Sequence, residues 1–375
     1  SSRVIEVSGQ DWPVDLRVHN PIDRDVQRLD TPVVSDIEPA PDGTWLVRAT
    51  GLRLGRDVSS ADVRALRGID VLRVDLDWLA DRRVAQLRAA GLLVDSAPVP
   101  PDPLDRLVVT HAARRAAMRD GSAMSSLGRW PSVSALVLTH RLDFVEHLVN
   151  QVSATAYPNL EILIGLHGVA GSASDSGAVT AQITEMLTAR GGHRVRVVAI
   201  DASLPFGAAL QRLSEQADGE VLTKVDDDDW YGPEHVWDLV LARMYSGATI
   251  VGKALDWIEV RGAACTVYRP VYRAETYASF VAGGTLLISA ADLLALGGWR
   301  PVPKSVDRAL LDRAKAHGAP VYRASGLGYC YVRHDGGHTA QVRDEHFLTR
   351  TAARWPGLLQ HAALGTEANP TQDQP

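Results

Sequence analysis

From about residue 132 onward, two kinds of hydrophobic pattern follow one another along the chain. Apolar runs of strand length are separated by stretches whose apolar positions recur with helical periodicity. In chain order, strands are expected at 133–139, 160–166, 195–200 and 220–225, with helices at 141–152, 178–190 and 206–217 between them. This alternation predicts a mixed, mainly parallel sheet flanked by helices. Ligands of such sheets gather outside the carboxyl ends of the strands, so we expect the functional site there.

The first hundred residues carry a weaker pattern of the same kind. Residues 71–76 are expected to form a strand, 79–90 a helix with apolar Val84, Leu87 and Ala90, and 92–94 another short strand. We therefore predict a small α/β accessory domain over residues 1–103.

A proline-rich passage and a polar tail complete the predicted organisation. The chain has 375 residues, which favours two domains. Four prolines fall within residues 96–103, and a helix and linker are expected over 104–130. The sheet domain is placed at 131–345, a C-terminal helix at 346–364 and a disordered tail at 365–375.

Composition and charge exclude some classes of protein. Hydrophobic residues make up 46% and charged residues 22%, which is typical of a globular protein. The formal net charge of −6 argues against a nucleic-acid partner. Cys265 and Cys330 form neither a metal cluster nor a disulfide framework, so a cytoplasmic location is expected. No apolar run is long enough for a transmembrane helix, which leaves peripheral membrane attachment open.

An acidic cluster follows the expected strand at 220–225. Asp226, Asp227, Asp228 and Asp229 are consecutive, and four adjacent carboxylates repel one another without a nearby cation. If strand geometry continues, Asp226 and Asp228 point to one side and Asp227 to the other. Two hard oxygen ligands on one side would suit Mg²⁺ or Mn²⁺ bridging a diphosphate.

Another interpretation of the cluster stays open at this point. The four residues could form a solvated acidic turn in which Asp229 helps to begin a helix after Pro233. A calcium loop of the EF-hand type is disfavoured, because its terminal Glu position is occupied by Trp237.

Several motifs in order resemble one enzyme family. Their segments are Ser134–Arg141, Gln151–Ile164 with Tyr157-Pro158-Asn159, Asp226–Tyr231, and Gly283–Ile288 followed by Leu296–Trp299. Together they resemble the family 2 glycosyltransferases of GT-A fold, with a Rossmann-like nucleotide-binding sheet, over about 210 residues. The resemblance implies an inverting transferase that moves a single sugar from a nucleoside-diphosphate sugar to a hydroxyl acceptor, such as a carbohydrate, with Mn²⁺ or Mg²⁺.

The resemblance also implies roles for individual residues. Donor-binding roles fall on Thr139, His140, Arg141, His167, Gly207, Lys224, Asp226 and Asp227. Metal ligation falls on Asp226, Asp228 and His338, with His334 as the next choice after His338. The acceptor and diphosphate loops would include Gly283, Gly284, Trp299, Arg333 and His334. The resemblance implies a UDP-sugar as donor, but it favours this nucleotide only weakly, because His167 stands where the family usually has an Asp that binds uracil.

The resemblance places the catalytic base at the head of a helix after the Gly297-Gly298-Trp299 turn. Asp307 holds that position, and Asp312 is the less favoured substitute. An inverting transfer needs such a carboxylate to take the proton of the acceptor hydroxyl. In the alternative interpretation Ser305 is a helix N-cap and Asp307 is an acid favoured by the helix dipole.

Other functions remain as alternatives. A nucleotidyltransferase on the same scaffold should have a glycine-rich loop after the first strand, and residues 139–143 contain no glycine. A non-catalytic carbohydrate- or partner-binding module also stays open, because a fold does not imply an activity. A processive polymerase is disfavoured, since only Arg354-Trp355 remains of that group's Q-x-x-R-W motif.

Overall fold

The computed structural model describes residues 32–121, 125, 127–168, 173–190, 192–334 and 343–367. The chain divides into two compact units, and among the described residues the first ends at Trp130 and the second begins at Pro131. Within the described part of the chain, no helix combines the length and the apolar character that crossing a membrane requires.

Unit 1 is a small α/β domain built on a five-stranded sheet. The strand order is β3-β2-β1-β4-β5, with β1, β4 and β5 parallel and β2 and β3 antiparallel. Trp45, Leu72 and Leu87 are buried in its core. Its elements are β1 (Val34–Pro39), β2 (Trp45–Val47), β3 (Leu52–Leu54), α1 (Ser60–Ala65), β4 (Val71–Arg73), η1 (Leu76–Trp78), α2 (Arg82–Ala89), β5 (Leu93–Asp95) and α3 (Pro103–Gly121).

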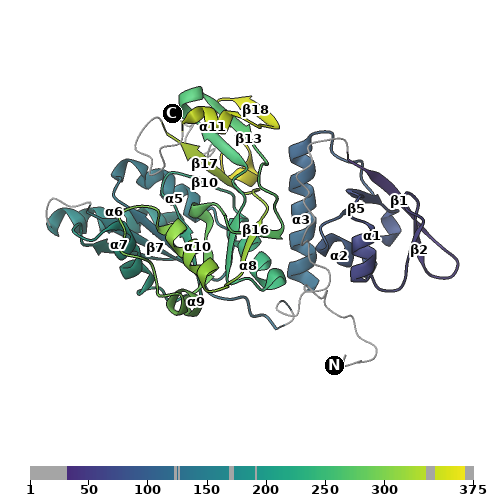
Figure 1. The fold of residues 1–375 in the computed structure, drawn as a ribbon, viewed down its shortest axis with the longest axis horizontal. Helices are drawn as coiled ribbons and strands as arrows, with labels where there is room; N and C mark the ends of the chain where they lie inside the picture. Colours follow the sequence, from purple (N-terminus) through teal and green to yellow (C-terminus); the bar gives the residue numbers. More distant parts are fainter. Residues whose placement is uncertain are drawn as a thin grey trace. The chain divides into compact units, whose positions relative to one another are not determined.

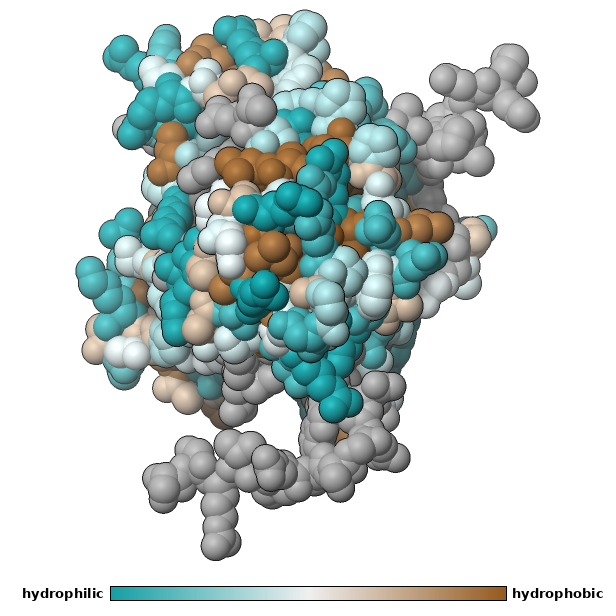
Figure 2. Space-filling view, turned by 90° about the vertical axis from the view of Figure 1, so that its right-hand side faces the viewer, coloured by the Kyte–Doolittle hydropathy of each residue, from teal (hydrophilic) through white to brown (hydrophobic). Residues whose placement is uncertain are grey.

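Unit 1 also exposes some large apolar side chains. Leu76 is 72% exposed and Trp78 38% exposed, both on η1. Figure 2 shows apolar residues among hydrophilic ones on the face turned to the viewer. Exposed apolar side chains such as these are normal on the surface of globular domains.

Unit 2 is built on an eight-stranded mixed sheet (Figure 1). Its strand order is β14-β16-β11-β15-β9-β6-β7-β8, in which β9, β6, β7 and β8 run parallel and β15 runs antiparallel to both of its neighbours. The sheet strands are β6 (Val133–Thr139), β7 (Leu160–His167), β8 (Arg194–Ile200), β9 (Val221–Val225), β11 (Ile250–Lys253), β14 (Thr276–Tyr277), β15 (Leu287–Ser289) and β16 (Val321–Ala324).

Helices cover both faces of this sheet, as the sequence pattern predicts. Side chains from α7, α9 and α10 pack with Leu136 and Leu138 of β6 in one core. Gln151 and Val152 of α5 and Val236 of α8 instead face Ala135, on the opposite side of the same strand. The helices of unit 2 are η2 (Leu142–Phe144), α5 (Val145–Ser153), α6 (Ala173–Arg190), α7 (Phe206–Ser214), α8 (His235–Ser246), η3 (Arg261–Ala263), η4 (Gly283–Thr285), α9 (Ala290–Ala295), α10 (Val306–Ala316), α11 (Asp344–Leu348) and η5 (Ala362–Leu364).

A second, five-stranded sheet in unit 2 has the order β10-β17-β12-β13-β18. Its strands are β10 (Trp230–Tyr231), β12 (Trp257–Val260), β13 (Cys265–Tyr268), β17 (Tyr329–Arg333) and β18 (Ala353–Pro356). β10 follows the acidic cluster directly and pairs with β17, so this sheet connects the cluster to residues a hundred positions later.

The expected C-terminal helix over 346–364 is wrong. The structure has the end of α11, then β18, then the short η5 in this region. β18 pairs antiparallel with β13, with Trp355 opposite Thr266. Pairing with an available strand edge overrides the weak helical pattern, and Pro356 and Gly357 are poor helix residues.

The C-terminal segment packs behind the acidic cluster. The Gln151 side-chain amide donates to the Gly365 carbonyl at 3.2 Å, and the Gly365 backbone lies against that of Tyr231. Gly232 lies so close to Ala363 that a Cβ on it would overlap the Ala363 carbonyl oxygen. The backbone after the acidic cluster is therefore held from behind by a segment more than 130 residues away in sequence.

Gly232→Ala should destabilise unit 2 by about 1–3 kcal/mol, because two stretches of backbone would have to separate. The free energy of urea unfolding of the full chain measures this effect. The matched control is Gly177→Ala on α6, where a Cβ would meet nothing within 4 Å. The control should be neutral or stabilising by about 0.5–1 kcal/mol, since Ala favours helix. Equal stabilities for the two variants would contradict the packing described here.

Candidate active site

The carboxyl ends of β6 and β9 meet at one edge of the large sheet and open into a cleft. The strands are parallel neighbours with Val137 opposite Val225, so the residues that follow each strand lie side by side. The cleft has a volume of about 520 Å³. It is lined by Leu138, His140, Arg141, Phe206, Lys224, Asp226, Asp227, Asp228, Asp229, Pro303, Lys304, Ser305, Val306, Asp307, Tyr331 and His334.

Arg141 neutralises two of the four consecutive carboxylates. Its guanidinium forms a forked ion pair with Asp227, and its Nη1 donates to Asp228 Oδ2 at 2.9 Å. The Thr139 hydroxyl donates to Asp227 Oδ2 at 2.5 Å. Burial disfavours the charged guanidinium, but the bonds to Asp227 and Asp228 outweigh it and raise the pKa of Arg141. Asp227 is therefore a buried anchor for Arg141.

Lys224 links the acidic cluster to Asp307. Its buried Nζ forms an ion pair with Asp226 and lies 3.4 Å from Asp307 Oδ1. Burial works against the charged amine, but Asp226 and Asp307 raise the pKa of Lys224. Lys224 is therefore a buried cation that offsets the repulsion between the carboxylates of Asp226 and Asp307.

Asp229 faces inward and is held by β17. Its carboxylate accepts hydrogen bonds from the Tyr329 hydroxyl at 2.7 Å and from the Val332 backbone N–H at 2.8 Å. Burial first, and then Asp228 and Asp226, raise the pKa of Asp229 well above its ordinary value. A solvated acidic turn is therefore excluded as an account of Asp229. The helix expected after Pro233 is α8, but the residue that precedes it is Glu234 and not Asp229.

The expected side-to-side alternation of the cluster is wrong. β9 ends at Val225, so strand geometry does not continue through the aspartates. Asp227 and Asp228 both bond to Arg141, whereas Asp226 turns to Lys224. Two cations, rather than the pleat of a strand, decide where these carboxylates point.

Two adjacent glycines let the carboxylates approach the opposite wall. A Cβ on Gly284 would lie 2.8 Å from Asp226 Oδ2 and 3.1 Å from Asp229 Oδ2. A Cβ on Gly283 would overlap the carboxylate of Asp307. These glycines are therefore packing positions of the site, a role that only a residue without a side chain can fill.

Asp307 stands in the first turn of α10, at the rim of the cleft. Ser305, the residue before the helix, has φ +58° and its side chain makes no capping hydrogen bond. The alternative interpretation, in which the Ser305 side chain caps the helix, is therefore wrong. A positive φ at a serine is an uncommon conformation, and here it falls two residues before the candidate base.

Several residues expected in the site lie elsewhere. Gly207 donates its N–H to the Val302 carbonyl, Trp299 is buried in the core with side chains of α7 and α10, and Arg333 pairs with Asp344 at 3.0 Å. His167 has its Nε2 2.9 Å from the Leu204 carbonyl and does not line the cleft. His338 lies outside the described residues.

The structure adds cleft residues that sequence reasoning missed. Phe206, Lys304 and Tyr331 line the cleft, and the Phe144 ring lies under the Arg141 guanidinium at 4.5 Å. Tyr331 could have been found, because it lies two residues after Tyr329, on the same face of the strand that precedes the expected histidine ligands. Phe206 and Lys304 carry no distinguishing local signal.

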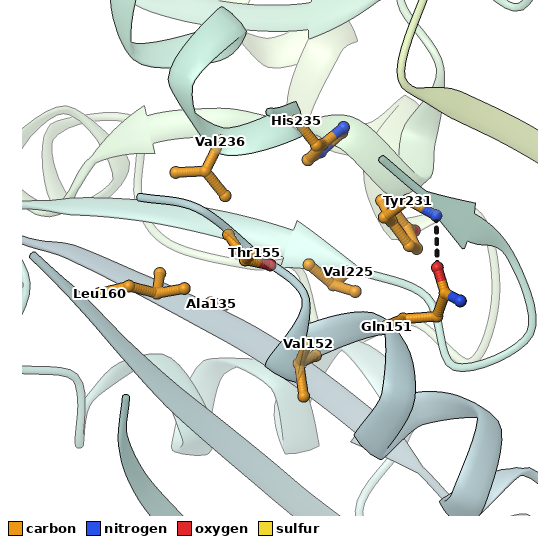
Figure 3. Close-up of a pocket in the computed structure, with 9 residues that line it drawn as sticks. All are labelled: Ala135, Gln151, Val152, Thr155, Leu160, Val225, Tyr231, His235 and Val236. Atoms are coloured by element: carbon orange, nitrogen blue, oxygen red, sulfur yellow. Dashed lines mark hydrogen bonds between the residues drawn. The ribbon is translucent and has the colours of Figure 1, made fainter. Parts of the chain in front are cut away.

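A second, small cavity is lined by residues of α5, α8 and the strands beside them, and it shows the role of Gln151. Figure 3 shows Gln151 at its edge, with the side-chain oxygen accepting the Tyr231 backbone N–H at 2.8 Å. The Tyr231 hydroxyl in turn accepts the Asp226 N–H at 2.8 Å and donates to the Gly284 carbonyl at 3.0 Å. Gln151 thus fixes the tyrosine that holds Asp226 against Gly284.

His235 lines the same cavity, which at about 10 Å³ has room for about one water molecule. Burial, and then the nearby charge of Lys253, lowers the pKa of His235 to about 3. An ordinary histidine pKa lies near 6.5. In acid the unfolded chain therefore takes up a proton at this residue before the folded chain does.

Lowering the pH from about 7 to about 5 should therefore destabilise the folded protein through His235, by up to about 1.4 kcal/mol per pH unit below pH 6.5. The free energy of urea unfolding, measured across this window, should fall less steeply for His235→Gln than for the natural chain. His317→Gln is the control, because His317 is exposed on the end of α10. Identical slopes for His235→Gln and the natural chain would refute the burial argument.

The donor chemistry of the cleft fits a divalent cation. Asp226 and Asp228 offer carboxylate oxygens, the donors that Mg²⁺ and Mn²⁺ favour, and His334 Nε2 lies 3.1 Å from Asp228 Oδ2. Among the described residues, however, no three His, Cys, Asp or Glu side chains form a ready-made metal-binding group. A cation here would need further ligands from a bound anion or from outside the described residues.

Comparisons with known proteins find similarity of fold only. No protein-family model and no curated protein matches the chain. Among solved structures, the mannosyltransferase PcManGT from Pyrobaculum calidifontis, in complex with GDP-Man and Mn²⁺, is similar over 56% of this chain and 59% of its own, with 13% identity and a TM-score of 0.44. TarS 1–349 from S. aureus, in complex with UDP-GlcNAc, is similar over 58% of this chain and 63% of its own, with 17% identity and a TM-score of 0.43. The chain thus covers less than two thirds of either structure.

Proposed function

We propose that this chain is a glycosyltransferase that moves one sugar from a nucleoside-diphosphate sugar to a hydroxyl acceptor, with inversion at the anomeric carbon. The observation that carries the proposal is the meeting of Asp226, Asp228 and Asp307 in one cleft at the carboxyl ends of parallel strands. Ligands bind at that edge in open α/β sheets. The family resemblance of the sequence motifs supports the same proposal.

The acidic side of the cleft is proposed to bind the diphosphate through a divalent cation. Asp228 and Asp226 would hold the ion, with His334 beside Asp228 and His338 as a further candidate ligand. When bound, Mn²⁺ or Mg²⁺ neutralises the negative charge of a departing nucleoside diphosphate. Asp227, which is only 6% exposed, is proposed to position Arg141 instead of serving as a ligand.

Asp307 is proposed to take the proton of the acceptor hydroxyl. Its carboxylate is 29% exposed on the cleft side, so an acceptor can reach it, and Lys224 holds its Oδ1 at 3.4 Å. A carboxylate that a bound acceptor can reach from the cleft can take the proton of its hydroxyl. Because Lys224 also forms an ion pair with Asp226, it fixes the position of Asp307 relative to the carboxylates on the donor side of the cleft.

The remaining cleft residues are proposed to bind the two substrates. Lys304 and Arg141 are the cations near the rim and would attract a diphosphate. Phe206 and Tyr331 offer flat apolar surfaces on which a base or a sugar ring could stack. His140, exposed at the end of β6, is proposed to lie near the nucleotide.

Ligand-induced stabilisation tests the proposal. A nucleoside diphosphate that binds the folded chain with Mn²⁺ should raise the melting temperature, whereas Mn²⁺ with inorganic sulfate should not. UDP, GDP and dTDP form the panel, each with Mn²⁺ and with EDTA. A rise with one nucleotide that EDTA abolishes supports the proposal. If none of the three raises the melting temperature, a non-catalytic module becomes the better account.

A further inference from the structure

Arg141 lies on the carboxylate that the proposed function gives to the cation. Its Nη1 donates to Asp228 Oδ2 at 2.9 Å, and His334 Nε2 lies 3.1 Å from that same oxygen. Mg²⁺ binds its oxygen ligands at about 2.0–2.1 Å. A guanidinium and a divalent ion on one oxygen would repel each other strongly in this partly buried cleft.

Arg141 is bound more strongly to Asp227 than to Asp228. Nε and Nη2 form a fork on Asp227, which is 6% exposed and also bonded by the Thr139 hydroxyl. Asp228 receives a single guanidinium bond and is 18% exposed. Loss of the Asp228 bond would therefore leave Arg141 anchored in the cleft by its fork on Asp227.

We propose that Arg141 is a built-in competitor of the divalent cation at Asp228. Arg141 would give up its bond to Asp228 when that carboxylate holds the cation, and the freed Nη1 would donate to the diphosphate while the fork on Asp227 persists. This inference rests on the cation in the proposed function and adds a role that the proposed function does not require. Arg141 thereby makes the cation and the nucleotide bind cooperatively, since displacement creates a donor for the nucleotide.

The ring of Phe144 favours such an exchange. The Arg141 guanidinium lies over this ring at 4.5 Å, so part of its contact energy does not depend on Asp228. The ring also contacts His334 edge-on, with the centroids 5.6 Å apart. The guanidinium can therefore change its partner by a small movement above Phe144 without entering solvent completely.

Two affinities that move in opposite directions test the inference. The affinity for Mn²⁺ alone is measured by titration calorimetry on the full chain, and the affinity for the nucleoside diphosphate is then measured at saturating Mn²⁺. Arg141→Gln should bind Mn²⁺ about tenfold more tightly than the natural chain, because the competing charge is gone. It should bind the nucleoside diphosphate about tenfold more weakly, because a charged donor is lost. Arg141→Lys keeps the charge but lacks the fork. Its affinity for Mn²⁺ should lie between that of the natural chain and that of Arg141→Gln.

Arg212→Gln is the matched control. Arg212 forms an exposed ion pair with Glu215 on α7, and its loss should leave both affinities unchanged. Circular dichroism and the melting temperature establish that each variant is folded, and Arg141→Lys carries the test if Arg141→Gln does not fold. Mn²⁺ affinity that is equal or lower without the arginine overturns the inference while the proposed function stands. If the natural chain binds no Mn²⁺ even with the nucleotide, the cation in the proposed function fails together with the inference.

Discussion

Asp228→Asn should lower turnover by two to three orders of magnitude, a loss of about 10²–10³-fold. The amide keeps the shape of the side chain and can still accept the Arg141 bond, so the fold should persist. It offers a cation no negative charge, so the leaving diphosphate would lose much of its stabilisation. Steady-state turnover, with the Mn²⁺-dependent rise in melting temperature as a second readout, measures the change.

Asp218→Asn is the control for this substitution. Asp218 pairs with Arg194 on the exposed end of β8, away from the cleft. Turnover by Asp218→Asn should equal that of the natural chain. Near-normal turnover by Asp228→Asn with an unchanged Mn²⁺ requirement would remove Asp228 from the site.

Asp307→Asn should abolish proton removal and lower kcat by about 10²–10⁴-fold. Binding of the nucleoside diphosphate should be nearly unchanged, because Asp307 is reserved for the acceptor in this mechanism. The comparison therefore needs both kcat and the dissociation constant of the nucleotide with Mn²⁺. A change confined to kcat is a result that a merely structural role would not produce.

Asp312→Asn, on the same helix as Asp307, is the control. Asp312 lies on α10 and pairs with Arg308 at 2.8 Å, and its side chain is 60% exposed. Asp312→Asn should keep full turnover. The reverse outcome, an active Asp307→Asn and an inactive Asp312→Asn, would move the base to the residue that the sequence ranked second.

The sequence predicted the edge of the sheet at which the site forms, because local patterns determine it. The apolar runs that became β6, β7, β8 and β9 are all present, and the acidic cluster follows β9 directly. Strand-length apolar runs between helices leave few other arrangements. The prediction of a C-terminal helix is wrong because β18 is defined by its pairing with β13, which is a tertiary contact.

The internal geometry of the site could not be predicted in the same way. The orientation of Asp227 and Asp228 depends on Arg141, 86 residues earlier than Asp227, and Asp229 depends on Tyr329, a hundred residues later. Such contacts follow from strand order and not from local periodicity. The sequence could name Arg141 as a cleft residue, but its contact with Asp228 appears only in three dimensions.

Release of a nucleoside diphosphate from a panel of nucleotide sugars tests the central claim most directly. The natural chain is incubated with each sugar nucleotide and Mn²⁺, and the released diphosphate is quantified beside Asp228→Asn and an EDTA control. We expect one sugar nucleotide to be consumed well above the rate in buffer, with the release abolished in both controls. Release from none of them, or release equal in the natural chain and Asp228→Asn, would contradict the assignment of this cleft to sugar transfer.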